Sequence, residues 1–201
     1  MSKLEVFFDC SSPWTYLAIT QVGGIARAHG AELIWRPILV GGIFNQINKE
    51  VYETRANPDH PKYRYMRKDL MNWADYRGVT INWPTIFPVN SVKAMRACIA
   101  AADIGKCETL ALEVCDAYWG RNQDIAQDEV VAACAEAVGL DAAAILEKTN
   151  DPEIKQRLKN HTQEVMDRQG FGSPTMYVNE TDMFFGQDRL VLVEEALKRA
   201  A

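Results

Sequence analysis

The chain has 201 residues, of which 48% are hydrophobic and 24% are charged, and its formal net charge is −5. This composition is typical of a compact globular protein and argues against disorder. The acidic balance, without a basic patch, argues against a nucleic-acid partner. No apolar run reaches the roughly 18 residues that span a bilayer, and the N-terminus lacks a signal-peptide pattern. We therefore expect no membrane partner and a cytoplasmic protein.

The five cysteines form neither a Cys-x-x-Cys pair nor a cluster with histidine, so we predict no disulfide framework and no metal site. Cys10 lies in the loop two residues before Ser12, where a packing role is expected and a direct chemical role of the thiol is the alternative. The other four lie in helical patterns, where a thiol acts as a small core side chain: Cys98, Cys107, Cys115 and Cys134.

The chain opens with a strand, a helix and a second strand. The apolar run over residues 4–9 predicts the first strand, and His29-Gly30 closes a helix over 13–30. The second strand is expected over 32–38. This βαβ pattern predicts two parallel strands joined by a helix.

Ser12-Pro13-Trp14-Thr15 follows the first strand at the predicted helix start. Proline is tolerated in the first helical turn, so residue 12 is expected at the helix N-terminus, where free N–H groups stabilise an anion. In redox proteins this environment lowers the pKa of an attacking cysteine, but neither Ser12 nor Thr15 can exchange disulfides. We therefore expect a cofactor to supply the thiol and the Ser12 hydroxyl to donate a hydrogen bond to it. An ordinary N-cap serine is the alternative.

The middle of the chain, from residue 45 to about 168, is mostly helical in pattern. Helices are expected over residues 63–76, 91–104, 108–119, 128–138 and 151–169. Asn90-Ser91 and Gln127-Asp128 are candidate caps.

The last part of the chain predicts a hairpin and a helix. A glycine-rich turn leads into a strand through Ser173-Pro174, where proline is tolerated and the bond can be cis. Strands over 174–178 and 182–186 are expected to pair across Asn179-Glu180-Thr181, and an amphipathic helix follows from Asp188.

Three motifs, in this order, resemble the DsbA-like thioredoxin superfamily and, more narrowly, 2-hydroxychromene-2-carboxylate isomerases and kappa-class glutathione transferases. They are Ser12-Pro13-Trp14, then Ser173-Pro174-Thr175, then Phe184-Phe185-Gly186-Gln187-Asp188. The resemblance runs from end to end. It implies an α/β fold with a thioredoxin-like domain of residues 1–44 and 168–201, an inserted all-helical domain of residues 45–167, and a ligand cleft between them. It also implies glutathione as cofactor and a homodimer.

The resemblance implies how the thiol end of glutathione is held. Ser12 would hydrogen-bond the sulfur, with Pro13 and Trp14 forming the adjoining wall. Ser173, before a presumed cis Pro174, would pair its backbone with the cysteinyl part, as an added strand does.

The resemblance also implies the contacts of the other end. The γ-glutamyl part would meet the segment Phe185, Gly186, Gln187 and Asp188. Asn57 would close over the ligand from the insertion. The alternative to a ligand contact of Asp188 is a plain helix cap. The alternative for Asn57 is a structural role in a turn, because Asn-Pro is a common turn sequence.

Aromatic side chains are candidates for the substrate wall. Phe44, Phe87 and Trp83 would suit a flat bicyclic acid, and Asn90 matches an asparagine of the family; core and cap roles are the alternatives. Some isomerases of the family carry a lysine where this chain has Phe44, a departure that bears on the substrate. The candidate cations for an anionic substrate are Arg36, Lys49, Arg55 and Lys62.

The activity implied by the resemblance is a glutathione-dependent isomerase of aromatic catabolism, as in naphthalene degradation. It would convert 2-hydroxychromene-2-carboxylate to trans-o-hydroxybenzylidenepyruvate. The first alternative is a kappa-like transferase or peroxidase that acts on other electrophiles. The second is a non-catalytic thioredoxin-fold binding module whose serine is only a cap.

Overall fold

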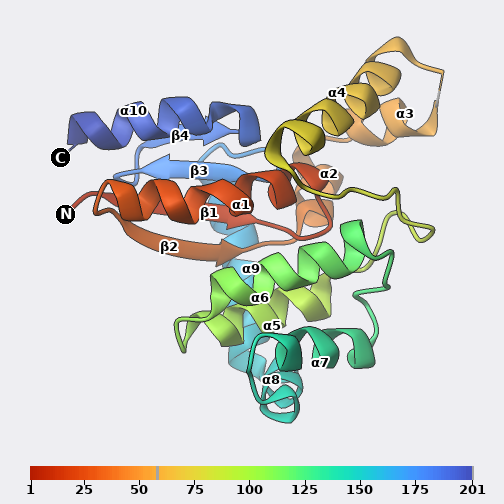
Figure 1. Cartoon of the computed structure of the whole chain (residues 1–201), viewed down its shortest axis with the longest axis vertical. Helices are drawn as coiled ribbons and strands as arrows, with labels where there is room; N and C mark the ends of the chain where they lie inside the picture. Colours follow the sequence, from red (N-terminus) through yellow and green to blue (C-terminus); the bar gives the residue numbers. More distant parts are fainter. Residues whose placement is uncertain (58, 201) are drawn as a thin grey trace.

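The computed structural model describes residues 1–57 and 59–200, and its described strands form one mixed sheet in the order β2-β1-β3-β4 (Figure 1). Strand β1 (Lys3–Phe8) runs parallel to β2 (Glu32–Pro37) and antiparallel to β3 (Thr175–Val178). The edge strand β4 (Asp182–Phe185) pairs antiparallel with β3. Val6 lies opposite Trp35 on one side and Met176 on the other, so β1 is central to the sheet.

The two faces of the sheet follow the alternation of side chains along β1. Leu4, Val6 and Phe8 belong to a large core that includes residues of α1 (Pro13–Ala28) and α10 (Leu190–Ala200). Phe7 points the other way, into a smaller core with side chains of α2 (Val40–Ile47) and α9 (Pro152–Asp167). Helices therefore cover both faces.

The remaining helices form two groups in Figure 1. Helices α3 (Glu50–Ala56) and α4 (Pro61–Arg77) project beyond the start of α1. The second group lies below the sheet and consists of α5 (Val92–Ala102), α6 (Cys107–Cys115), a π-helical turn η1 (Asp116–Gly120), α7 (Asp128–Ala137) and α8 (Ala142–Thr149). In the described part of the chain, no helix combines the length and the apolar character that crossing a membrane requires.

The predicted α/β thioredoxin-like architecture is confirmed, and the predicted strands and helices end within about two residues of the observed ones, with one exception. The helix predicted over 108–119 is divided into α6, which ends at Cys115, and the π-helical turn η1. Three short helices, α2, α3 and α8, were not predicted individually. Helix α2 starts with weak helix formers, Gly41 and Gly42, and Leu39 at its N-cap makes no side-chain cap bond. Helix α8 does carry a local signal, since Asp141 accepts the Ala144 N–H at 3.1 Å.

Helix α2 also runs across residue 44, where the sequence places the end of the first domain segment. The division into a thioredoxin-like domain and a helical insertion therefore stays a prediction.

A buried ion-pair network surrounds Glu5 on β1. The Glu5 side chain is 4% exposed and accepts from Arg36 at 3.2 Å and from Arg168 at 2.6 Å. Burial opposes ionisation, but the hydrogen bonds from the two guanidinium groups outweigh it and lower the pKa of Glu5. Arg168 also lies 3.8 Å from the centre of the Tyr177 ring. This network is distant from the motifs and serves the fold.

Candidate functional site

The first wall of the site is the start of α1. Ser12 is the N-cap residue, with extended φ and ψ of −99° and 122°, and Pro13 occupies the first helical turn. The Ser12 Oγ accepts the Thr15 N–H at 3.4 Å and donates to the carbonyl of Ser173 at 3.1 Å. The predicted position of Ser12 at a helix N-terminus is confirmed, and its cap bond coexists with a second bond across the site.

The second wall is the cis peptide bond between Ser173 and Pro174, at the head of β3. Ser173 is buried, and its Oγ accepts the Asp9 N–H at 2.9 Å and lies 2.6 Å from the Thr15 Oγ1. The two predicted motifs therefore meet, although 161 residues separate Ser12 from Ser173. A second cis bond, Phe87-Pro88, was not predicted.

The third wall follows β4, where the 3₁₀ turn η2 (Gln187–Arg189) begins after Gly186, whose φ is 98°. Gln187 is 1% exposed, and its Oε1 has no hydrogen-bond partner. Asp188 was considered as the cap of the last helix. This is corrected by the structure: Gly186 precedes the turn, and the Asp188 carboxylate pairs with Arg189 at 2.8 Å.

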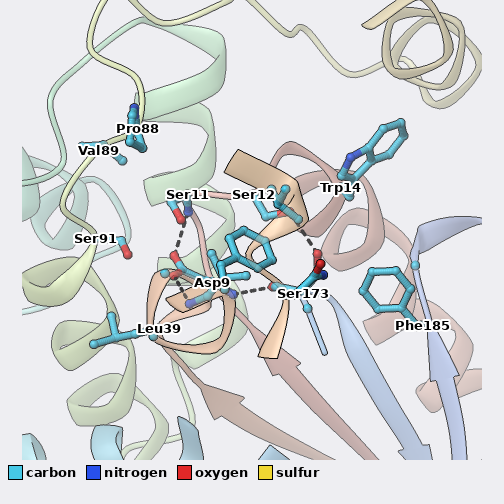
Figure 2. Close-up of a pocket in the computed structure, with 18 of the residues that line it drawn as sticks. Asp9, Ser11, Ser12, Trp14, Leu39, Pro88, Val89, Ser91, Ser173 and Phe185 are labelled. Carbon is cyan, nitrogen blue, oxygen red and sulfur yellow. Dashed lines mark hydrogen bonds between the residues drawn. The ribbon is translucent and has the colours of Figure 1, made fainter. Parts of the chain in front are cut away.

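These walls enclose one side of a cavity of about 630 Å³. Figure 2 shows the Ser12–Ser173 pair between the Asp9 loop on one side and Trp14 and Phe185 on the other. The predicted residues that line the cavity are Ser12, Trp14, Phe44, Phe87, Asn90, Ser173, Phe185, Gly186, Gln187 and Asp188. The predicted residues therefore form part of the cavity lining, and other lining residues, such as Val40, Tyr52 and Asp69, were not predicted.

Other predicted residues lie elsewhere. Pro13, Pro174 and Trp83 do not line the cavity, and Trp83 packs against the buried core. Asn57 is exposed, away from the cavity lining, and its Oδ1 accepts the Asp59 N–H at 3.1 Å, as in a turn. Asn90 lines the cavity and also accepts the Val92 N–H at 3.1 Å, so its predicted capping role is present.

Among the described residues, Arg189 is the one cation that lines the cavity, and it pairs with Asp188. Arg36 pairs with Glu5 and lines a different cavity, and neither Lys49 nor Lys62 lines the main one. The side chain of Arg55 lies outside the described residues. Three carboxylates line the same cavity: Asp9, Asp69 and Asp188.

Cys10 is fully buried and packs in the core, as expected. Its Sγ lies 3.7 Å from the Ala111 carbonyl oxygen, and the Trp119 Nε1–H donates to its carbonyl at 2.9 Å. Burial raises the pKa of the Cys10 thiol well above its usual value. The four helical cysteines are buried as well, and all five are free.

Sequence reasoning missed Asp9, a 1% exposed carboxylate in the cavity wall. Its Oδ1 accepts the Ser11 N–H and its Oδ2 the Val40 N–H, each at 2.9 Å. Burial raises the pKa of Asp9 above its ordinary value, against the opposing effect of these hydrogen bonds. The available signal was an acid at the end of a buried strand, three residues before Ser12.

Comparison with known proteins identifies the family. The model of the DSBA-like thioredoxin domain matches residues 3–198, so the chain belongs to this family. It is 28% identical over 200 residues to the 2-hydroxychromene-2-carboxylate isomerase of Sphingobium xenophagum, covering 96% of this chain and 97% of the relative. It is 27% identical over 208 residues to human glutathione S-transferase kappa 1, covering 96% and 90%.

A solved structure of 2-hydroxychromene-2-carboxylate isomerase has the same fold, with a TM-score of 0.80 and 23% identity over 98% of this chain and 95% of that one. The resemblance stated from the motifs is thus confirmed at the level of family and fold.

Proposed function

We propose that this chain binds glutathione in the cavity, stabilises its thiolate beside Ser12, and acts as a glutathione-dependent enzyme on a small electrophilic substrate. The observation that carries the proposal is the meeting of the Ser12 hydroxyl, at the N-terminus of α1, with the backbone of Ser173 at one end of a largely apolar cavity. The relatives named as isomerase and as glutathione S-transferase support it.

The chain fits a thiolate at this point. Lowering a thiol pKa from roughly 8.5 by about two units requires ~2.7 kcal/mol of preferential stabilisation of the thiolate. The positive end of α1 contributes, because its first turn contains no acidic side chain. The Ser12 hydroxyl has one hydrogen, now directed to the Ser173 carbonyl. We expect it to turn to the sulfur, which frees that carbonyl to accept the cysteinyl N–H.

The chain also fits the γ-glutamyl end. The Gln187 Oε1 is buried without a partner, which is costly unless a ligand donor meets it. The neighbouring Asp188 carboxylate and Arg189 guanidinium offer one charge of each sign. An α-amino acid carries the complementary pair of charges, so we assign its ammonium to Gln187 and Asp188 and its carboxylate to Arg189 and the backbone of η2.

Bound glutathione would supply the thiolate that adds to an electron-poor carbon of the substrate. In the isomerase reaction, 2-hydroxychromene-2-carboxylate becomes trans-o-hydroxybenzylidenepyruvate and the cofactor is released unchanged. Phe44 and Phe87 would flank the flat substrate, and Trp14 would cover the thiol end.

A kappa-like transferase is the second candidate, and the charges of the cavity favour it. The isomerase substrate is a carboxylate, yet the one described lining cation already pairs with Asp188, and three carboxylates line the same space. At about 5 Å and an effective dielectric constant near 20, two like charges repel by roughly 3 kcal/mol. An uncharged electrophile would avoid this repulsion.

The first experiment is calorimetric titration of wild type and Ser12→Ala with glutathione, together with thiolate absorbance near 240 nm. We expect a thiolate signal in wild type at neutral pH and its loss in Ser12→Ala. Thr20→Val, which removes a hydroxyl from the same helix outside the cavity, is the matched control and should keep the signal. Absence of binding, or a signal unchanged by Ser12→Ala, would return Ser12 to the role of a helix cap in a non-catalytic module.

The second experiment decides the reaction. The chromene carboxylate is assayed for isomerisation, and two conjugated ketones, uncharged benzylideneacetone and anionic benzylidenepyruvate, are assayed for conjugation. Each enzymatic rate is divided by the uncatalysed rate with glutathione. Turnover of the chromene establishes the isomerase, whereas preference for the uncharged ketone without chromene turnover establishes the transferase.

A further inference from the structure

Asp9 is a buried charge that the proposed chemistry does not use. It is 1% exposed, and the groups that hydrogen-bond its carboxylate in the described part of the chain are the neutral N–H groups of Ser11 and Val40. The charge of Asp9 also opposes the ionisation of two buried thiols, Cys98 on α5 and Cys115 on α6. Burying a carboxylate without a cation destabilises a fold, so its presence in a cavity wall marks a functional candidate.

The hydrogen bonds of the Asp9 side chain join two separate walls of the cavity. One carboxylate oxygen holds the loop before Ser12 through the Ser11 N–H, and the other holds the first residue of α2, Val40. Ser91, which precedes α5, lines the same cavity and favours the ionised form of the carboxylate. Figure 2 shows Asp9 among Ser11, Leu39 and Ser91.

The backbone of Asp9 continues this connection to the thiol end of the site. Its carbonyl accepts the Ser12 N–H at 3.0 Å, and its N–H donates to the Ser173 Oγ at 2.9 Å. The backbone of Asp9 therefore contacts both residues that are proposed to face the sulfur, Ser12 and Ser173.

We propose that Asp9 is a positioning residue, whose carboxylate holds the Ser12 loop and α2 together and so sets the geometry of the glutathione site. The inference rests on the proposed function for its ligand, but the bridge between the walls exists without ligand. A carboxylate has the acceptors for both N–H groups at once, whereas a carboxamide offers one oxygen and turns an N–H₂ toward the second. Protonation of Asp9 weakens the bridge in the same way.

The test compares wild type with Asp9→Asn and with Glu5→Gln, a matched control because Glu5 is another buried carboxylate, on the strand that precedes Asp9 and outside the cavity. S-methylglutathione is the probe, since it has no thiol to titrate. By calorimetry at neutral pH, we expect Asp9→Asn to bind roughly tenfold more weakly than wild type and Glu5→Gln to bind equally. Wild-type affinity should fall as the pH is lowered into the range where Asp9 takes up a proton, and more steeply than that of Asp9→Asn.

Amide hydrogen exchange without ligand is the second measurement. Peptides covering residues 9–16 and 38–46 should exchange faster in Asp9→Asn than in wild type, and not in Glu5→Gln. Unchanged exchange in both segments would overturn the bridge, whether or not glutathione binds. Faster exchange with unchanged affinity for the probe would overturn the positioning role. If wild type fails to bind the probe at all, the proposed function fails, and exchange still decides the bridge.

The stability of Asp9→Asn tests the direction of the pKa shift of Asp9. A folded-state pKa above the unfolded value means that stability is lost as pH rises through the range between them. The melting temperature of Asp9→Asn, relative to wild type, should therefore become more favourable as pH rises above about 4. A relative melting temperature that falls over this range would contradict a buried, weakly acidic Asp9.

Discussion

Some side chains at this site serve both the stability of the fold and the binding of a ligand, and these two requirements conflict. Ser12 caps α1 and at the same time donates to Ser173, so a residue that looks like an ordinary helix cap also faces the ligand cavity. Gln187 and Asp9 are buried polar groups whose cost to the fold is not fully offset by protein partners. Such groups are expected where stability is exchanged for binding.

A substitution of Gln187 tests whether stability of the fold is given up in favour of ligand binding. Replacing it by Met keeps a similar volume and removes the buried Oε1, which lacks a partner. The ligand-free protein should therefore be stabilised by about 1 kcal/mol, while glutathione should bind roughly tenfold more weakly. Thermal melting and calorimetry measure the two effects. Gln163→Met, at an exposed position of α9, is the control and should leave binding unchanged. A destabilised Gln187→Met with normal affinity would show a structural role only.

Nothing in the local sequence indicates that Gln187 is buried. Its residue type and position were assigned through the motif, whereas its burial depends on how η2 packs against α1. Asp9 was missed for the same kind of reason, because its partner Val40 is distant along the chain.

Secondary-structure elements were predicted best where the signal is local. Helix α9 has a capping aspartate and Pro152 in its first turn, and α1 has Ser12 and Pro13. Helix α2 escaped prediction because its first N–H is satisfied by Asp9, which lies 31 residues earlier. The helix forms only when the tertiary fold brings this acceptor to it.

Alanine substitutions of two consecutive glycines in α1, Gly23 and Gly24, test how this helix packs against α6. Both lie inside the helix, where Gly is about 1 kcal/mol less favourable than Ala. A methyl at Gly24 meets no atom within 4 Å, so Gly24→Ala should stabilise the protein by about 1 kcal/mol. A methyl at Gly23 meets the Glu108 carboxylate of α6, which pairs with Arg27. Gly23→Ala must displace that side chain, so it should stabilise the protein less than Gly24→Ala or destabilise it. Urea unfolding measures both changes. Equal gains in stability would contradict the packing of α1 on α6.

The whole molecule is held by a core that crosses the predicted domain boundary. The large core contains Leu4 and Leu17 of the thioredoxin-like part together with Leu110 and Trp119 of the helical part. Burial of shared apolar surface couples the two parts, so neither can unfold without exposing the other.

We therefore expect one cooperative transition in urea. Tryptophans report on both parts, with Trp35 on β2 and Trp119 in η1. The chain has five tryptophans, and fluorescence of variants that retain Trp35 alone or Trp119 alone should give the same midpoint as far-UV circular dichroism of the same variant. Separate midpoints would show that the predicted domains unfold independently.

The sequence by itself determined the family, the thioredoxin-like core and the two motifs that meet at the cavity, because caps, prolines and apolar periods act over a few residues. Only the tertiary structure decided which charges line the cavity, that Asn57 lies outside it, and that Asp9 joins its walls. These properties depend on burial and on contacts between distant segments. The residues next to a side chain in the sequence show neither how deeply it is buried nor which distant segments it contacts.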